Sequence, residues 1–291
     1  MVTRDPPSEQ TGSLVDTQAP SSPTRPIRRT ALDMRPPRVF QRPNTALLVA
    51  EPTRAVSEIA SFTAALPTLR KLPKGDGRPV LVLPGFTASD ASTQILRRWL
   101  RSLNYNPFGW KLGVNLGPTP AIVDAMFSRF ATIRRQTGQP LTLIGWSLGG
   151  LYARALAERY PNDVRHVITL GSPFRLSEKD QTNAGALFEV LNGRHLGPHD
   201  VSIRSDGYRG APTMASTAIF SRTDGIVPWR ACIDEPSPSS ENVEVRGSHT
   251  GLGHNPSVLL VLANRLRLEL GAFEPFVETG HTCFPAVPYK S

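Results

Sequence analysis

The stretch Leu141-Thr142-Leu143-Ile144-Gly145-Trp146-Ser147-Leu148-Gly149-Gly150 joins a short apolar run to a Gly-x-Ser-x-Gly pattern. The run at 141–144 predicts a buried parallel strand, and residues 148–160 predict a helix that ends before Pro161. Gly145 and Gly149 leave space for a sharp turn between the strand and the helix, which would hold the Ser147 hydroxyl clear of the sheet. Ser147 is therefore a candidate nucleophile.

Strand-like and helix-like segments alternate on both sides of this stretch. Further strands are expected at 79–83, 110–114, 164–170, 214–220 and 243–245, and helices at 92–103, 118–136 and 256–270. Strands separated by helices of this length indicate a parallel sheet that is covered on both faces. We therefore predict an α/β fold with a mostly parallel central sheet and helices on both faces, with a site at the carboxyl ends of the strands.

The segments outside this alternation suggest the domain organisation. Residues 1–43 are rich in Pro, Ser, Thr and Arg and have few large apolar side chains, so we predict a disordered Pro/Arg-rich tail. Residues 44–291 are expected to form one domain, braced from outside by a helix or pair of helices within 45–72. The polar stretch 175–212 is long for a connection and is either a small cap over the site or a mobile loop.

Charge and hydropathy limit the classes of partner. The chain of 291 residues has 33 Lys and Arg against 24 Asp and Glu, which gives a formal net charge of +9. The basic residues are scattered and form no recognisable nucleic-acid-binding module, so nucleic acid is not expected as a partner. Because no apolar run approaches the ~20 residues of a membrane span, no transmembrane segment is expected either.

Cysteine usage and the N-terminus suggest the compartment. Cys232 and Cys283 are the only cysteines, and in a chain of this size two unpaired thiols in a reducing cytosol are favoured over a single disulfide. The first 20 residues lack the apolar core of a secretory signal, and charged residues and prolines follow Arg28-Arg29 where twin-arginine export needs an apolar segment. We therefore expect a cytoplasmic protein.

A serine nucleophile needs a histidine base, and the histidine needs a carboxylate to fix its tautomer. Asp224 follows the strand expected at 214–220 and is the candidate acid. His249 and His254 both follow the last expected strand. His254 stands beside the start of a helix, where the helix dipole disfavours the imidazolium form that a general base must reach. We favour His249 as the base and keep His254 as the alternative.

Attack on a carbonyl creates an oxyanion, which backbone N–H groups must stabilise. One expected donor is the amide of Leu148, the residue after the nucleophile. The second should come from the turn after the strand at 79–83, where Gly85 permits a close approach and Phe86 supplies the donor, with Thr87 as the alternative. The side chains of Phe86 and Trp146 are expected to bind the substrate.

Four segments together resemble the α/β-hydrolase superfamily, most nearly its small bacterial lipases and esterases. They are Val82-Leu83-Pro84-Gly85-Phe86, Gly145-Trp146-Ser147-Leu148-Gly149-Gly150, Thr223-Asp224-Gly225-Ile226-Val227-Pro228 and Ser248-His249-Thr250-Gly251-Leu252. The resemblance covers about residues 78–271. It implies an α/β-hydrolase fold without a metal or organic cofactor, and it supports His249. Those lipases usually have histidine before the glycine of the oxyanion turn, where this chain has Pro84, so the second donor is left open.

The leading hypothesis is a carboxylic-ester hydrolase that acts through an acyl-serine intermediate on a small-molecule or lipid ester. Acyl transfer to another acceptor uses the same residues and is the first alternative. A catalytically idle fold that serves as a binding module is the second. Neither the preferred acyl group nor the oligomeric state follows from the sequence.

Overall fold

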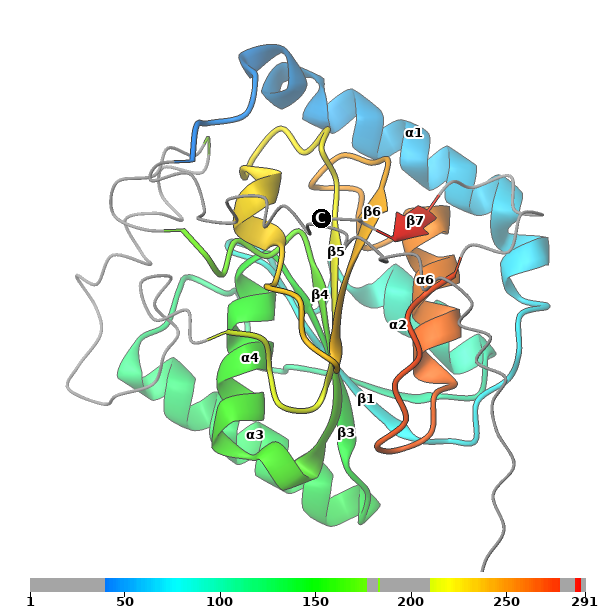
Figure 1. The fold of residues 1–291 in the computed structure, drawn as a ribbon, viewed down its shortest axis with the longest axis vertical. Helices are drawn as coiled ribbons and strands as arrows, with labels where there is room; N and C mark the ends of the chain where they lie inside the picture. Colours follow the sequence, from blue (N-terminus) through cyan, green and yellow to red (C-terminus); the bar gives the residue numbers. More distant parts are fainter. Residues whose placement is uncertain (1–39, 177–182, 184–209, 278–285, 289–291) are drawn as a thin grey trace, which may run out of the picture. The chain divides into compact units, whose positions relative to one another are not determined.

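The computed structural model describes residues 40–176, 183, 210–277 and 286–288 (Figure 1). The predicted tail over 1–43 lies outside the described residues except for its last four, and so does most of the stretch 175–212. The assignment of these segments as a tail and as a cap or loop therefore stays a prediction.

Among the described residues, seven strands form one sheet in the order β2-β1-β3-β4-β5-β6-β7. Neighbouring strands from β2 to β6 are parallel, and β7 pairs antiparallel with β6. This confirms the predicted mostly parallel sheet. The strands are β1 (Pro79–Leu83), β2 (Asn106–Gly109), β3 (Leu141–Trp146), β4 (Val164–Leu170), β5 (Ala215–Phe220), β6 (Ser240–Val245) and β7 (Ala286–Pro288).

Helices cover both faces of the sheet, as predicted (Figure 1). Leu81 and Leu83 of β1 pack on one face with the apolar side chains of α3 and α4, whereas Val80 and Val82 pack on the other with those of α1, α2 and α6. This is the period of two that a strand buried on both faces requires. In the described parts of the chain the helices are α1 (Thr45–Leu69), α2 (Gln94–Ser102), α3 (Pro120–Thr137), α4 (Leu148–Arg159) and α6 (Pro256–Leu266). Short 3₁₀ turns there are η1 (Pro161–Asp163) and η3 (Trp229–Cys232).

The strand predicted at 110–114 is wrong, because β2 ends at Gly109. The carboxylate of Asp90 accepts hydrogen bonds from the backbone N–H groups of Trp110 (3.0 Å) and Lys111 (3.1 Å). Lys111 has a φ of 60°, in the left-handed region. The amides that would continue the strand are thus taken by a side chain, and the backbone turns out of the sheet.

The segment predicted as one helix or two is the single helix α1. Its first turn is capped by Asn44, whose side-chain oxygen accepts a hydrogen bond from Ala46 N–H at 2.8 Å. Pro52 lies inside the helix rather than in its first turn. The helix begins before the proline because the Asn44 side chain accepts a hydrogen bond from a backbone N–H of the first turn.

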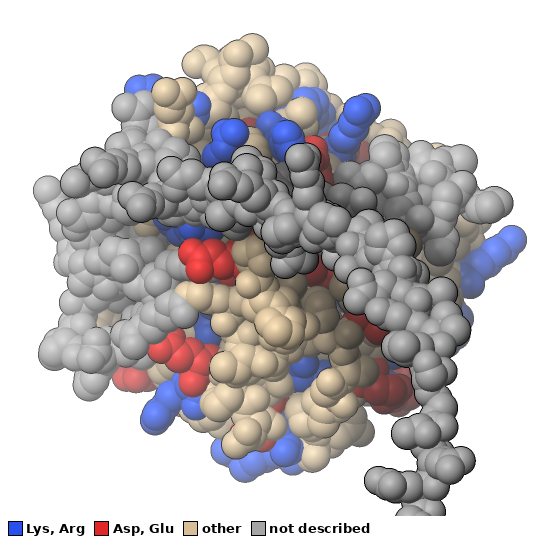
Figure 2. All heavy atoms as spheres, in the orientation of Figure 1, with Lys and Arg blue, Asp and Glu red and all other residues tan. Residues whose placement is uncertain are grey.

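The described residues also bear on the membrane, charge and cysteine predictions. None of their helices combines the length and apolar character needed to cross a membrane. In the view of Figure 2, the described Lys and Arg side chains are interspersed with acidic ones and do not gather into one continuous patch. Cys232 is a buried free thiol, and Cys283 lies outside the described residues.

The surroundings of His166 predict that the stability of the protein depends on pH. Its Nε2 lies 2.9 Å from Thr217 Oγ1 on the neighbouring strand. Burial, together with the positive charges of Arg265 and Arg165, lowers the pKa of His166 from 6.5 to about 3. Between these pH values the unfolded chain takes up a proton that the folded protein refuses, so the free energy of unfolding falls as the pH falls.

The substitution His166→Gln removes this titration. Between pH 6 and pH 5, the free energy of unfolding of the wild type should fall more steeply than that of the variant, by about 1 kcal/mol per pH unit. Urea denaturation at several pH values measures both slopes. Equal slopes would mean that the folded protein accepts the proton on His166.

Candidate active site

Ser147 occupies the turn between β3 and α4 with φ 53° and ψ −121°. A positive φ at a residue other than glycine costs about 1–3 kcal/mol and persists only where the surroundings enforce it. The Ser147 N–H donates to Leu170 O of β4 at 2.9 Å. A Cβ on Gly149 would lie 2.7 Å from the carbonyl carbon of Leu83, and one on Gly145 would overlap the backbone of Gly149. The close packing of strand and helix therefore requires both glycines.

Asp224 and His249 form a buried hydrogen-bonded pair. His249 Nδ1 lies 2.6 Å from Asp224 Oδ2. The other carboxylate oxygen, Oδ1, accepts hydrogen bonds from Ile226 N–H and Val227 N–H, each at 2.8 Å. Because both oxygens are held, the carboxylate has one orientation, and it fixes the histidine ring so that Nε2 is the free nitrogen.

The pair lies against the ends of β3 and β4, where Ser147 stands. Trp146, the residue before the serine, donates its indole N–H to His249 O at 3.0 Å. A Cβ on Gly171, directly after β4, would lie 3.2 Å from His249 Nδ1 and 3.3 Å from Asp224 Oδ2. Within the described residues, no hydrogen bond joins the Ser147 hydroxyl to the His249 ring. Such contacts are often long in a free enzyme and tighten when substrate binds.

The second histidine candidate has a different environment. His254 Nε2 lies 3.2 Å from Ala55 O of α1, and burial lowers the pKa of His254 despite this contact. The described carboxylates include none that hydrogen-bonds its ring. His166 is buried within the sheet, and His195, His199 and His281 lie outside the described residues.

The charge on His249 is controlled by its neighbours. Burial by itself lowers the pKa of His249, but the Asp224 carboxylate, through its charge and its hydrogen bond, and the charge of Glu51 raise the pKa overall. The imidazolium form is thus favoured beside these carboxylates. Among the described residues, no group of three or more His, Cys, Asp or Glu side chains could hold a metal ion.

The turn after β1 lies directly over the serine. A Cβ on Gly85 would lie 3.2 Å from Ser147 Cβ. The amide of Thr87 donates to Asn115 O at 2.7 Å, so this alternative donor is already used. Within the described part of the chain, the amides of Phe86 and Leu148 have no acceptor, which leaves both available for a ligand oxygen.

The two residues predicted to bind substrate are both half-buried. Phe86 packs against the apolar cluster on the α3 and α4 side, whereas Trp146 packs on the opposite side and supports the His249 backbone. Contact of either ring with a substrate stays a prediction.

Sequence reasoning missed Asn115, which holds the turn after β1. Asn115 is fully buried, and its Nδ2 donates to Pro84 O at 2.9 Å. Its Oδ1 accepts from the hydroxyl of Tyr152 on α4 at 3.0 Å, and its backbone carbonyl accepts from Thr87 N–H. An asparagine in a loop gives no signal of this role, and the misplaced strand at 110–114 hid the loop itself.

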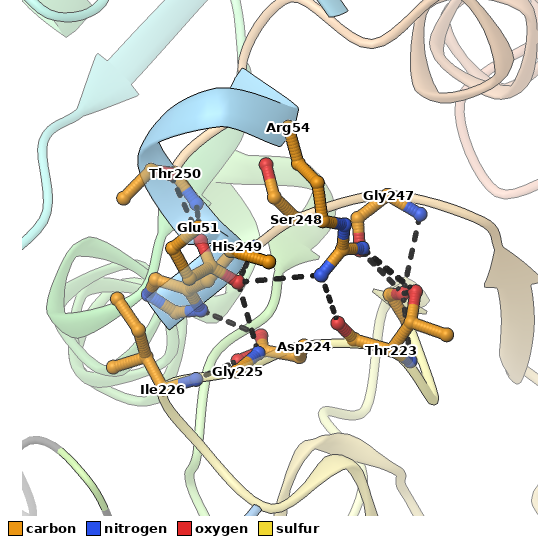
Figure 3. Close-up of polar contacts among 12 residues, drawn as sticks. Glu51, Arg54, Thr223, Asp224, Gly225, Ile226, Gly247, Ser248, His249 and Thr250 are labelled. Carbon is orange, nitrogen blue, oxygen red and sulfur yellow. Dashed lines mark hydrogen bonds and ion pairs between the residues drawn. The ribbon is translucent and has the colours of Figure 1, made fainter. Parts of the chain in front are cut away.

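Sequence reasoning also missed Glu51 on α1, a buried carboxylate that contacts the loops of both Asp224 and His249 (Figure 3). One signal was present in the sequence. Glu51 and Glu58 are seven residues apart, which places two carboxylates on the same face of a helix whose inner face should be apolar.

The comparisons with known proteins agree with this architecture. A family model described as alpha/beta hydrolase fold matches residues 83–194, a range that contains Ser147 but neither Asp224 nor His249. No curated protein matched the sequence. Solved structures did match, at sequence identities so low that the similarity shows the fold alone.

The matching structures include several lipases. Aspergillus fumigatus lipase B is 16% identical, with 66% of this chain and 54% of that chain covered and a TM-score of 0.50. A Bacillus licheniformis lipase in its mature form is 14% identical, with coverages of 68% and 95% and a TM-score of 0.48. A monoacylglycerol lipase from Paleococcus ferrophilus is 14% identical, with coverages of 66% and 96% and a TM-score of 0.47.

The role of Asn115 can be tested by stability alone. Asn115→Ala leaves the buried Pro84 carbonyl and the Gly117 amide, which donates to Asn115 Oδ1 at 3.2 Å, without these partners. Each unsatisfied group costs about 1–3 kcal/mol, so urea denaturation should show a loss of at least about 2 kcal/mol. The matched variant Tyr152→Phe removes only the hydroxyl and should cost about 1 kcal/mol. Equal losses in the two variants would contradict this assignment.

Proposed function

The chain has the α/β-hydrolase fold, and from this premise we propose that it is a serine-dependent carboxylic-ester hydrolase. The observation that carries the proposal is the buried Asp224–His249 pair, whose hydrogen bond is 2.6 Å long. It lies at the strand ends beside the strained turn of Ser147. A buried carboxylate–imidazole pair at a strand-to-helix serine turn is the arrangement that activates a hydroxyl nucleophile.

In the proposed first step, Ser147 Oγ attacks the carbonyl carbon of the ester while His249 Nε2 takes the hydroxyl proton. Asp224 Oδ2 accepts the hydrogen bond of Nδ1–H and stabilises the imidazolium that forms. We expect the contact between the Ser147 hydroxyl and His249 Nε2 to tighten when substrate binds.

The tetrahedral intermediate carries its negative charge on the former carbonyl oxygen. The amides of Leu148, at the start of α4, and of Phe86, in the turn over Ser147, would donate to this oxygen. We assign the second donor to Phe86 because the Thr87 amide already donates to Asn115 O. Removal of one such donor costs about 100- to 1000-fold in rate in other serine hydrolases.

The imidazolium then gives its proton to the leaving alcohol, and an acyl ester of Ser147 remains. Water, activated by the neutral His249, attacks this ester and releases the carboxylic acid, which restores the Ser147 hydroxyl. The substrate is proposed to be a small-molecule or lipid ester, and the reaction needs no cofactor. From the cysteine usage of the sequence we propose the cytoplasm as the place of action.

Ser147→Ala should abolish turnover of p-nitrophenyl esters, with a loss of at least about 10⁴-fold in kcat. Circular dichroism and the urea midpoint serve as controls for folding. A fluorophosphonate probe should label the wild type at Ser147 and leave the variant unlabelled. Undiminished turnover in folded Ser147→Ala would rule out the proposed mechanism.

The choice of base is tested by comparing His249→Ala with His254→Ala. The first should reduce kcat by about 10⁴-fold or more, whereas the second should change it far less because His254 contacts α1 rather than Asp224. In the wild type, kcat/KM should fall as the pH falls through the raised pKa of His249, since only the neutral ring accepts a proton. Inactivity of His254→Ala alone would assign the base to His254.

A further inference from the structure

Helix α1 contacts both loops that carry the acid and the base. Figure 3 shows Glu51 and Arg54 of α1 between the loop after β5, at 223–226, and the loop after β6, at 247–250. Helix α1 lies outside the range that the family model matches. The contacts therefore belong to an element that precedes the matched part of the fold.

The carboxylate of Glu51 accepts four hydrogen bonds from these two loops. Its Oε1 accepts from Gly225 N–H and His249 N–H, both at 2.9 Å. Its Oε2 accepts from the Thr250 N–H at 3.0 Å and from the Thr250 hydroxyl at 2.9 Å. One oxygen thus joins the residue after Asp224 to the backbone of His249 itself.

The fit between α1 and the loops depends on small residues. A Cβ on Gly225 would lie 2.6 Å from the carbonyl group of Leu47 on α1, and one on Gly251 would overlap the Glu58 carboxylate. Glu58 accepts hydrogen bonds from the Ser248 N–H at 2.6 Å and from the Ser248 hydroxyl at 3.0 Å. The helix is therefore seated against the backbone of both loops.

Glu51 is held as a buried anion. Burial by itself raises the pKa of Glu51, but the backbone N–H groups of Thr250, His249 and Gly225 lower it overall, so the carboxylate is charged at neutral pH. Arg54 lies 3.9 Å from Glu51 Oε1 and donates to Thr223 O at 2.7 Å and to Thr223 Oγ1 at 2.9 Å. The loop of Asp224 is thus bound to α1 by a cation as well as by an anion.

We propose that Glu51 is a positioning residue for the acid–base pair, which fixes the two loops relative to each other and stabilises the protonated form of His249 by its negative charge. This inference rests on the proposed function. Glu51 acts through the backbone of His249 and through the electrostatic field at its ring, and it needs no contact with substrate.

Other charged and titratable groups lie near Glu51 and the His249 ring, and a test has to leave them unchanged. Asp224 faces the His249 ring from the loop after β5. Arg54 and Glu58 on α1 interact with Glu51, and Cys232 on η3 interacts with Asp224. Glu51→Gln leaves all of them in place while it removes one charge and one acceptor oxygen.

The first readout is the pKa of the His249 ring, which NMR measures in protein with isotope-labelled histidine. The His249 signal is identified by its loss in His249→Gln. Glu51→Gln should lower this pKa, because the imidazolium loses a neighbouring anion. Arg54→Met removes a cation from the same cluster and should leave the pKa unchanged or raise it. This readout needs no turnover, so it tests Glu51 even if the protein hydrolyses no ester.

The second readout is the pH profile of kcat/KM. Glu51→Gln should lower kcat/KM by roughly 10- to 100-fold through misplacement of the base, and it should move the acidic limb to lower pH. Glu51→Asp, which keeps the charge, should leave the acidic limb in place. Glu244→Gln is the matched control, since Glu244 pairs with Arg222 on the surface at 3.0 Å, and it should change neither quantity.

Two results would overturn the inference. One is an unchanged pKa of His249 in folded Glu51→Gln. The other is an acidic limb of the kcat/KM profile that stays at the wild-type pH in folded Glu51→Gln, because the charge of Glu51 would then have no effect on His249. Should Glu51→Gln fail to fold, Thr250→Val removes a single hydrogen bond to Oε2 and should still lower kcat/KM. Failure of the proposed function would show itself differently, as persistent ester turnover in Ser147→Ala.

Discussion

The hydrogen bond between Asp224 Oδ2 and His249 Nδ1 forms only if the loop after β5 and the loop after β6 bring these side chains together. Parallel pairing of β5 with β6 brings their carboxyl ends together, and hydrogen bonds from Ser221 Oγ and Thr223 Oγ1 to Gly247 O join the loops just beyond. The sheet thus supplies the approximate position, and side-chain contacts in the loops supply the precision that a proton transfer needs.

Burial of the Asp224 and Glu51 carboxylates beside the His249 imidazole is costly unless the protein solvates them. Asp224, Glu51 and Glu58 receive hydrogen bonds mainly from backbone N–H groups rather than from cations. Backbone amides are fixed dipoles, so they solvate these anions without the side-chain entropy that a long basic side chain would lose. The His249 ring is thereby held beside two buried carboxylates.

Much of this arrangement could be predicted from the sequence, because continuous apolar runs define buried strands. The strands at 79–83 and 164–170 have the predicted bounds, and the order of Ser147, Asp224 and His249 follows from the strands that precede them. The location of β2 could not be predicted, since the amides after Gly109 bond to Asp90, twenty residues earlier. The spacing of Glu51 and Glu58 indicated a polar stripe on α1, but the partners of Glu51 could not be predicted because they lie in loops far along the chain.

That separation has a consequence for when the site comes into being. Glu51 and Thr250 are 199 residues apart in the sequence. The hydrogen bonds of α1 to the loops of Asp224 and His249 can therefore all form only after Thr250 has been synthesised. During synthesis the Ser147 turn and strands β1 to β6 are made before Thr250, whereas α6 and β7 follow it. The order of the elements along the chain therefore delays the pairing of Asp224 with His249 until six strands of the sheet have been made.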